Sequence, residues 1–236
     1  VAGFVVRQAT ARRPLMPLHI LRSRGVAVAN VVQILTMAAM FAFQVLITLY
    51  LQQVLGYDAT GAGLAMLPAA VLIGAVSLGV SARLNTRFGE RAVLTAGLVL
   101  LVAMFALLVR VPVDGRYLTD VLPVMLLAGG GGLVLPALTS LGMSAARPDD
   151  AGLASGLFNT TQQIGMAFGV AVLSTLAAAR TAGRVALGDD RATALTSGFH
   201  LAFAIGAGLL VVAVALAYAL PRPRTAERAD APALVG

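Results

Sequence analysis

Six long runs of apolar residues dominate the sequence, and each is close to or above the roughly 18 apolar residues that a membrane-spanning helix needs. No useful stretch of alternating polar and apolar residues predicts the strands of a membrane barrel. The predicted fold class is therefore all-α, a polytopic membrane protein with six transmembrane helices. The predicted spans are 26–51, 61–82, 92–109, 121–144, 152–178 and 198–220.

The composition agrees with this class. Hydrophobic residues make up 59% of the chain and charged residues 11%, against about 45–50% and about 25% in soluble domains. This excludes a disordered chain and an ordinary cytosolic enzyme. The net charge of +7 comes from arginines that lie between the apolar runs, so no nucleic-acid partner is predicted. The chain has no cysteine, and we predict neither a metal site nor a cofactor.

The first residues predict that this chain continues a longer protein. The apolar segment Val1–Val6 is too short to span a bilayer and runs directly into Arg7. We interpret residues 1–25 as the end of a preceding helix followed by a basic cytoplasmic linker. Residues 26–220 then form the six-helix bundle, and residues 221–236 form a cytoplasmic tail.

Arginines are distributed unequally between the two ends of the predicted spans. If the linker is placed on one side of the membrane, that side carries 12 arginines and the opposite side carries 5. Positive charge accumulates on the cytoplasmic side of membrane proteins, so both ends of the chain are predicted to be cytoplasmic. The link 180–197 fits least well, because it carries three arginines on the outer side.

Several acidic residues lie directly before predicted spans. Asp58, Asp120, Asp149 and Asp150 each precede a span, where a carboxylate caps free N–H groups and suits the helix dipole. No charged residue lies deep within a span, although such residues commonly mark ion pathways. Any buried carboxylate that binds protons therefore belongs to a part of the protein outside this chain.

Two spans carry polar side chains. The first contains Asn30, Gln33, Thr36, Gln44 and Thr48, and the fifth contains a cluster from Asn159 to Gln163. Polar groups in lipid must face another helix or a water-filled cavity. The residue pattern leaves both alternatives open, namely hydrogen bonds between helices and the lining of a cavity.

Glycines predict close packing in the fourth and fifth spans. The fifth contains two small-xxx-small pairs, Gly152 with Gly156 and Gly165 with Gly169. The fourth contains a run of four glycines followed by a proline, which favours packing and bending, or a flexible element that helps a transporter change shape. The residues of that run are Gly129, Gly130, Gly131, Gly132 and Pro136.

Ser155 and His200 raise the alternative of an intramembrane serine protease. That chemistry needs the two side chains about 3 Å apart. They begin spans at opposite faces of the predicted bundle, so we predict that the protein is not an enzyme.

Three stretches carry a resemblance to a known family. They are Leu49-Tyr-Leu-Gln-Gln-Val-Leu-Gly-Tyr57 with the following Ala62–Pro68, the basic segment Gly79–Arg91, and Gly152–Gly169. Together they resemble the carboxy-terminal half of a major facilitator superfamily transporter. The likeness is strongest to the 14-helix drug:proton antiporter branch, the EmrB/QacA type, and it covers nearly the whole chain.

The resemblance implies a role and a location. The six spans would correspond to helices nine to fourteen of an exporter in the bacterial inner membrane. Its partners would be the lipid bilayer, a small lipophilic substrate and protons. The proton-coupling residues would lie in the missing half, and one bundle would supply one wall of a cavity. The basic segment departs from the family pattern, because Arg83 stands where the first-half motif carries an aspartate.

The resemblance also implies roles for particular residues. Asn30, Gln33, Gln44, Asn159 and Gln163 would be polar cavity lining, with Phe41 and Phe43 as apolar contacts. The cytoplasmic loop motif would hold its turn through helix-end carbonyls or lipid phosphates, or would act as a topology signal alone. Its residues are Gly79, Arg83, Arg87, Gly89 and Arg91.

Two rival functions remain open at this stage. One is a facilitator for a sugar or another metabolite. The other is a non-transporting membrane scaffold or a permease subunit driven by an ATPase, which would require a cytoplasmic coupling helix. Residues 7–24 contain Pro14 and Pro17 and instead favour a broken basic linker.

Overall fold

The structure is a computed structural model that describes residues 24–144 and 151–219, and every regular element in this part of the chain is helical. Six helical rods are long and apolar enough to cross a membrane, which confirms the predicted fold class. Four of them are α3 (Arg24–Gln53), α6 (Glu90–Leu108), α9 (Ala151–Ala186) and α10 (Arg191–Ala219).

The second and fourth rods are interrupted helices. The second joins α4 (Ala59–Ala75), a π-helical turn η1 (Val76–Val80) and α5 (Ser81–Phe88). The fourth joins a π-helical turn η2 (Tyr117–Val121), α7 (Leu122–Met125), a 3-10 turn η3 (Leu126–Ala128) and α8 (Gly129–Ser144).

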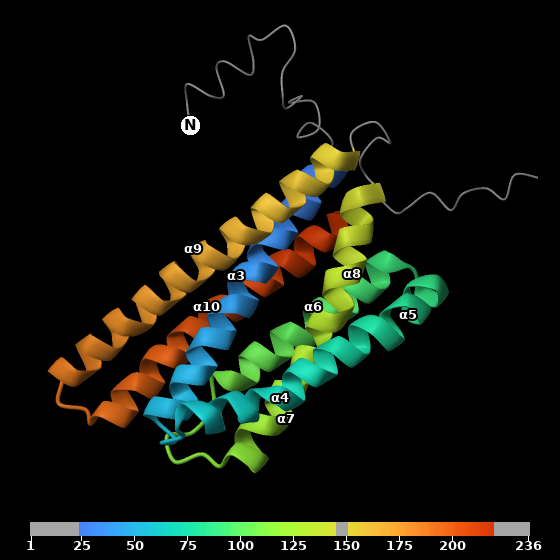
Figure 1. Cartoon of the computed structure of the whole chain (residues 1–236). Coiled ribbons are helices and arrows are strands. Elements are labelled where there is room, and N and C mark those ends of the chain that lie inside the picture. The colour runs from blue at the N-terminus through green and yellow to red at the C-terminus, as the bar shows by residue number, and fades with distance from the viewer. Residues whose placement is uncertain (1–23, 145–150, 220–236) are drawn as a thin grey trace, which may run out of the picture.

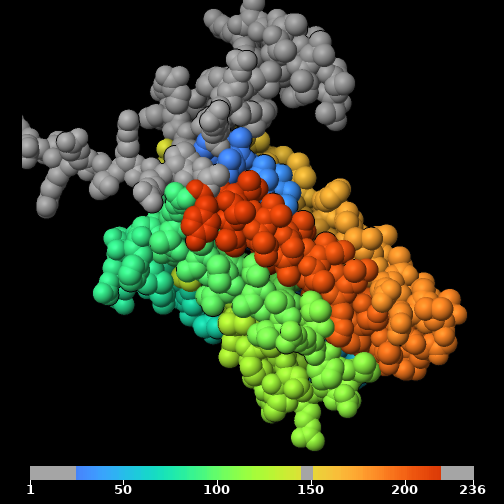
Figure 2. All heavy atoms as spheres, turned by 180° about the vertical axis from the view of Figure 1, so that it is seen from behind, coloured from blue at the N-terminus to red at the C-terminus, as the bar shows by residue number. Residues whose placement is uncertain are grey.

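The rods pack in two layers. In Figure 2 α10 and α6 cover the back of the molecule, whereas α3 is visible only near its first turns. Figure 1 shows α9, α3, α8 and α4 from the opposite side. α10 packs against α3, α6 and α9, while α8 packs against α3, α4 and α6. The rod from Ala59 to Phe88 is the least buried of the six.

Several helices extend beyond their predicted ends. The second rod continues to Phe88 rather than 82, α9 continues to Ala186 rather than 178, and α10 begins at Arg191 rather than 198. Hydropathy locates the segment inside the hydrocarbon, but a helix continues outside it wherever the backbone stays helical. The turns that end the second and fifth rods each contain a glycine with positive φ, Gly89 at 83° and Gly188 at 94°.

The seam between α3 and α9 depends on two of the predicted glycines. A Cβ atom on Gly165 would lie 2.8 Å from the carbonyl oxygen of Ile34, and one on Gly169 would overlap the backbone of Ala38. Glycine therefore lets the two backbones approach more closely than any other residue would.

The first glycine pair does not pack in the structure. A Cβ atom on Gly152 or Gly156 would have no atom within 4 Å apart from the helix itself and its chain neighbours, among the residues described. The pair thus contacts no neighbouring helix among the described residues, and its helix-packing role stays a prediction. Both glycines lie on an exposed surface of α9, so their spacing alone does not create a contact.

The four-glycine run lies where α8 crosses three neighbours. A Cβ on Gly130 would lie 2.6 Å from the carbonyl oxygen of Gly97 in α6, and one on Gly132 would lie 2.5 Å from that of Ile73 in α4. Gly129 and Gly131 instead approach the side chains of Leu72 and Met40. The run thus provides close packing, directly after the 3-10 turn that interrupts the rod.

Of the four acidic residues predicted to cap helices, Asp58 is confirmed by the structure. The Asp58 carboxylate accepts a hydrogen bond from the Gly61 N–H at 2.8 Å and caps α4. Asp120 lies inside η2 instead of before the rod, and its carboxylate accepts from the Arg116 N–H at 2.7 Å. At the start of α10, hydrogen bonds from Thr193 lower the pKa of Asp190. Asp149 and Asp150 lie outside the described residues.

The two glycine pairs give a matched stability test. Gly169→Ala should destabilise the protein by about 1–3 kcal/mol, because the added methyl group overpacks the α3–α9 seam. Gly152→Ala should be neutral or stabilise by up to about 1 kcal/mol, since alanine favours an exposed helix over glycine. Thermal unfolding of the purified protein in detergent measures both effects, and equal shifts for the two variants would contradict the seam.

Candidate functional site

An open pocket of about 470 Å³ lies along the second half of α3. Its polar groups are Gln44, Thr48 and Gln52, which follow each other at four-residue spacing and therefore share one face of the helix. The Thr48 hydroxyl donates to the Gln44 carbonyl at 2.7 Å, within its own helix. The pocket thus combines amide groups with apolar walls. It is lined by Phe41, Gln44, Val45, Thr48, Leu49 and Gln52.

A second group of exposed polar side chains lies in the first half of α9. Asn159, Thr160 and Gln163 are all exposed. The Asn159 amide donates to the Ser155 carbonyl at 3.2 Å, and the Thr160 hydroxyl donates to the Gly156 carbonyl at 2.9 Å. These bonds within the helix leave the Asn159 oxygen available to accept from another group.

The two groups lie at different depths. Thr161 contacts Asn30, Gly165 contacts Ile34 and Gly169 contacts Ala38, so α3 and α9 run parallel in a constant register. In this register Asn159 is level with residue 28 of α3, which lies about 24 Å along the helix axis from Gln44 at 1.5 Å per residue. We call Asn159, Thr160 and Gln163 of α9 the first polar zone, and Gln44, Thr48 and Gln52 of α3 the second polar zone.

Asn30 is not part of an open surface. Its side chain is 6% exposed, and its Oδ1 accepts a hydrogen bond from the Thr161 hydroxyl at 2.7 Å. Its amide also donates to the Val26 carbonyl at 2.8 Å. A polar residue in this span was predicted either to form a hydrogen bond between helices or to line a cavity. In the structure Asn30 forms a hydrogen bond between helices. The predicted cavity lining by Asn30 is therefore wrong for this structure.

Gln33 and Phe43 are also buried, whereas the sequence predicts both as cavity lining. Gln33 is 2% exposed, and its Oε1 has no hydrogen-bond partner within the described residues. Phe43 is 3% exposed, and its ring centre lies 6.0 Å from that of Phe105 in α6. Phe41, by contrast, is 39% exposed. Two residues separated by two positions on a helix point about 200° apart, so Phe41 and Phe43 cannot share a face.

The basic segment forms helix ends instead of a loop. Arg83 and Arg87 lie on α5 and are exposed, and the Arg87 guanidinium lies 5.3 Å from the ring centre of Phe88. Their placement in a loop was wrong because α5 continues to Phe88. Gly79 lies in the π-helical turn η1, and Gly89 provides the positive φ that separates α5 from α6.

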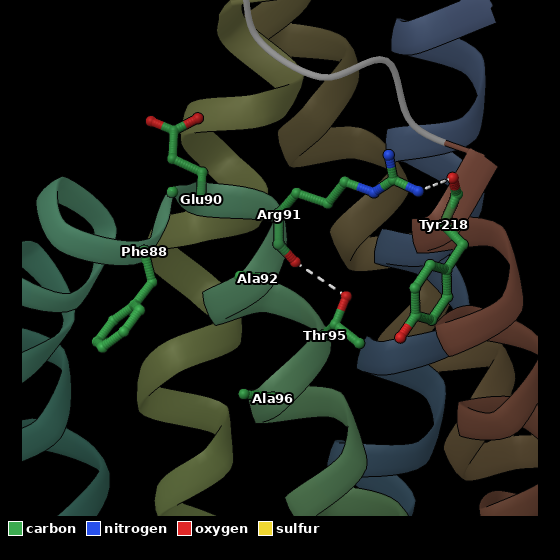
Figure 3. A pocket seen from close by; sticks show the side chains of 8 residues that line it. Phe88, Glu90, Arg91, Ala92, Thr95, Ala96 and Tyr218 are labelled. Atoms are coloured by element: carbon green, nitrogen blue, oxygen red, sulfur yellow. Dashed lines mark hydrogen bonds between the residues drawn. The ribbon is translucent and has the colours of Figure 1, made fainter.

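Arg91 connects the start of α6 to the end of α10. Its guanidinium donates to the backbone carbonyl of Tyr218 and lies 5.5 Å from the Tyr218 ring centre (Figure 3). Next to it, the Glu90 carboxylate accepts a hydrogen bond from the Ser140 hydroxyl in α8. Sequence reasoning missed Glu90 and Tyr218, because their partners lie 50 and 127 residues away in the chain.

The link between α6 and η2 is fastened by side chains that the sequence did not single out for this role. The Tyr50 hydroxyl donates to the Pro112 carbonyl at 2.6 Å, and His200 Nε2 lies 2.8 Å from the Val111 carbonyl oxygen. His200 is thus bonded to the backbone of this link. Ser155 is exposed near the start of α9, whereas His200 lies near the start of α10, which follows the other end of α9, so the two do not form a catalytic pair.

Comparison with known proteins identifies the family. The family description Major Facilitator Superfamily matches residues 3–170. The cephamycin export protein CmcT of Amycolatopsis lactamdurans is 37% identical over 78% of this chain and 38% of its own length. The puromycin resistance protein pur8 of Streptomyces alboniger is 31% identical over 98% of this chain and 47% of its own length.

A third relative comes from another genus. The lincomycin resistance protein LmrB of Listeria monocytogenes is 31% identical over 86% of this chain and 44% of its own length. The chain thus spans less than half the length of these relatives. The six apolar rods and the match to the family both indicate a membrane transporter family, which is not a family of enzymes. The chain is a multi-pass membrane protein that belongs to the Major Facilitator Superfamily.

Proposed function

We propose that the chain supplies one half of a proton-coupled exporter of drugs or lipophilic natural products, in the 14-helix drug:proton antiporter branch. Its six rods would be helices nine to fourteen of that exporter. The names of three relatives, which refer to export of cephamycin or resistance to puromycin or lincomycin, support an export role. The observation that carries the proposal is the pair of exposed polar zones on α3 and α9.

Exposed amides in an apolar rod need a polar neighbour. An 18-residue window of α3 has a mean hydropathy of 2.1, yet Gln44 on the exposed surface of this helix carries an amide. An amide in hydrocarbon without a hydrogen-bond partner costs several kcal/mol, on the order of 4–8. The second polar zone therefore favours a water-filled cavity over lipid. Phe41, Val45 and Leu49 around it suit a substrate that is mostly apolar.

The depths of the two zones suit a path across the membrane. Asn159 and Gln44 are about 24 Å apart along parallel helices, which is less than the thickness of a hydrocarbon core, about 30 Å. In an alternating-access transporter, one bundle rocks against the other and exposes the path to each side in turn. The first and second polar zones would then be wetted in opposite states of the exporter.

The coupling residues would lie outside this chain. No Asp or Glu lies deep within a described rod, and Glu90 is the first residue of α6. The proposed use of protons therefore rests on the resemblance to the antiporter branch. Among the described residues, the chain contributes polar but uncharged groups to the path.

We also propose the bacterial inner membrane as the location, with the α5–α6 turn on the cytoplasmic side. The orientation rests on the count of arginines on each side. Most of the arginines counted on the cytoplasmic side lie in residues 1–24, at position 147 and in residues 222–228. At the other end of the bundle, Arg184 forms an ion pair with Asp189 at 2.5 Å. The positive-inside rule counts arginines and lysines alone, so the link 180–197 still fits an outer position least well.

The polar zones can be tested by efflux of puromycin and lincomycin from cells that lack their own exporters. Gln44→Ala and Gln163→Ala in the full-length protein should each lower efflux roughly two- to tenfold, the effect of losing one hydrogen bond. Gln162→Ala is the matched control, because Gln162 adjoins Gln163 on α9 but points to another side of the helix.

A protonophore should abolish efflux by the unaltered protein. Efflux that persists without a proton gradient and depends on ATP would contradict the antiporter proposal. Unchanged efflux in both zone variants, with normal protein levels, would contradict the cavity. Transport of a sugar or metabolite with no effect on either antibiotic would favour the rival facilitator.

The orientation can be tested with single cysteines, because this chain has none. Leu187→Cys in the α9–α10 turn should react with a membrane-impermeant maleimide in intact cells. Thr86→Cys at the end of α5 should react only after permeabilisation. Any cysteines elsewhere in the full-length protein are replaced first, and the reverse labelling pattern would invert the proposed topology.

A further inference from the structure

A hollow of about 580 Å³ opens where α5 ends, α6 begins and α10 ends (Figure 3). It shares no residue with the polar zones of α3 and α9, so it is separate from the proposed export path. It combines one arginine with an apolar floor and two aromatic walls. It is lined by Phe88, Gly89, Glu90, Arg91, Ala92, Thr95, Ala96 and Tyr218.

The guanidinium of Arg91 is a cation that is held in place beside this hollow. One N–H donates to the Tyr218 carbonyl, and the guanidinium lies 5.5 Å from the Tyr218 ring centre. Figure 3 shows the side chain stretched from α6 to α10. A guanidinium carries five N–H donors in a planar fork, so donors remain for a second acceptor.

The charge around the hollow favours an anion. The one carboxylate that lines it, Glu90, accepts a hydrogen bond from Ser140 in α8, and Figure 3 shows it pointing away from Arg91. Arg87 directly precedes Phe88 in the chain, and its guanidinium lies 5.3 Å from the ring centre of Phe88, which lines the hollow. An anion at Arg91 would therefore meet a positive field.

The floor and walls favour a long apolar group. Ala92 and Ala96 are exposed on one face of α6 and leave a shallow strip along the helix. Phe88 and Tyr218, which are 59% and 62% exposed, stand on either side. Aromatic side chains gather at the boundary between headgroups and hydrocarbon. The hollow lies at the first turn of a rod, which is the depth of that boundary.

We propose that this hollow binds one anionic phospholipid. Its phosphate would pair with the guanidinium of Arg91, a charge-assisted contact that suits phosphate geometry. Its acyl chain would lie over Ala92 and Ala96, between Phe88 and Tyr218. A free phosphate would leave this apolar strip empty, whereas a lipid covers both parts. The lipid would fasten the start of α6 to the end of α10, in addition to the direct Arg91–Tyr218 contact.

The test compares two lipids of equal chain length on the full-length protein in detergent. Dioleoylphosphatidylglycerol should raise the melting temperature more than dioleoylphosphatidylcholine and should remain bound in native mass spectrometry. Arg91→Gln should weaken apparent binding of phosphatidylglycerol about fivefold, the effect of one arginine at an anionic lipid surface, and should leave phosphatidylcholine binding unchanged.

A second variant separates lipid binding from the Arg91–Tyr218 contact. Ala96→Leu fills the strip but keeps the arginine, so it should also reduce the stabilisation by phosphatidylglycerol. Ala106→Leu, on an exposed surface at the other end of α6, is its matched control. Arg110→Gln is the control for loss of charge. Both controls should respond to phosphatidylglycerol as the unaltered protein does.

Three results would overturn the proposal. The first is equal stabilisation of the unaltered protein by the two lipids. The second is an undiminished response to phosphatidylglycerol in both Arg91→Gln and Ala96→Leu. The third is equal stabilisation by soluble glycerol 3-phosphate, which would show that the site takes a free phosphate. None of these measurements depends on whether the protein exports antibiotics.

Discussion

The close approach of α3 and α9 is the contact on which the arrangement of the proposed path depends. Lipid chains are as apolar as the side chains of a membrane helix, so helices associate through close packing and interhelical hydrogen bonds. Gly165 and Gly169 allow that packing against Ile34 and Ala38. The hydrogen bond from Thr161 to Asn30 lies in the same seam and fixes its register. The depths of Gln44 and Asn159 follow from this register.

A second crossing holds the other side of the bundle. Gly130 and Gly132 near the start of α8 let its backbone touch α6 at Gly97 and α4 at Ile73. The rod of α4 and α5 is mostly exposed and depends on α8 for much of its packing. Small residues thus serve both seams, whereas the larger aromatic residues Phe43, Phe105 and Phe203 fill the space between the layers.

The sequence predicts the spans well, because a segment that crosses a bilayer must consist mostly of apolar residues along its whole length. It predicts the exposed side of a span poorly. Both the lipid side and the core side of a membrane helix are apolar, so Asn30, Gln33 and Phe43 were assigned to a cavity although they are buried. The amides of Gln44, Asn159 and Gln163 have the same chemistry as that of Gln33 but lie on exposed surfaces. Only the packing of neighbouring helices distinguishes these cases.

Spacing was also an incomplete guide. Gly152 and Gly156 repeat the spacing of Gly165 and Gly169, yet only the second pair meets another backbone. The contact of Arg91 with Tyr218 could not be predicted from local sequence, because it depends on how the ends of α6 and α10 meet.

The π-helical turn at Val76–Val80 changes the phase of the second rod. One additional residue in a turn rotates everything after it by about 100° relative to a regular helix. In an uninterrupted helix, Arg83 and Arg87 would point roughly opposite to the exposed Leu67 and Val71. With the wide turn they lie closer to the same side as those leucine and valine side chains. A single inserted residue therefore sets the direction in which the rod presents its positive charge, without any change in the arginines themselves.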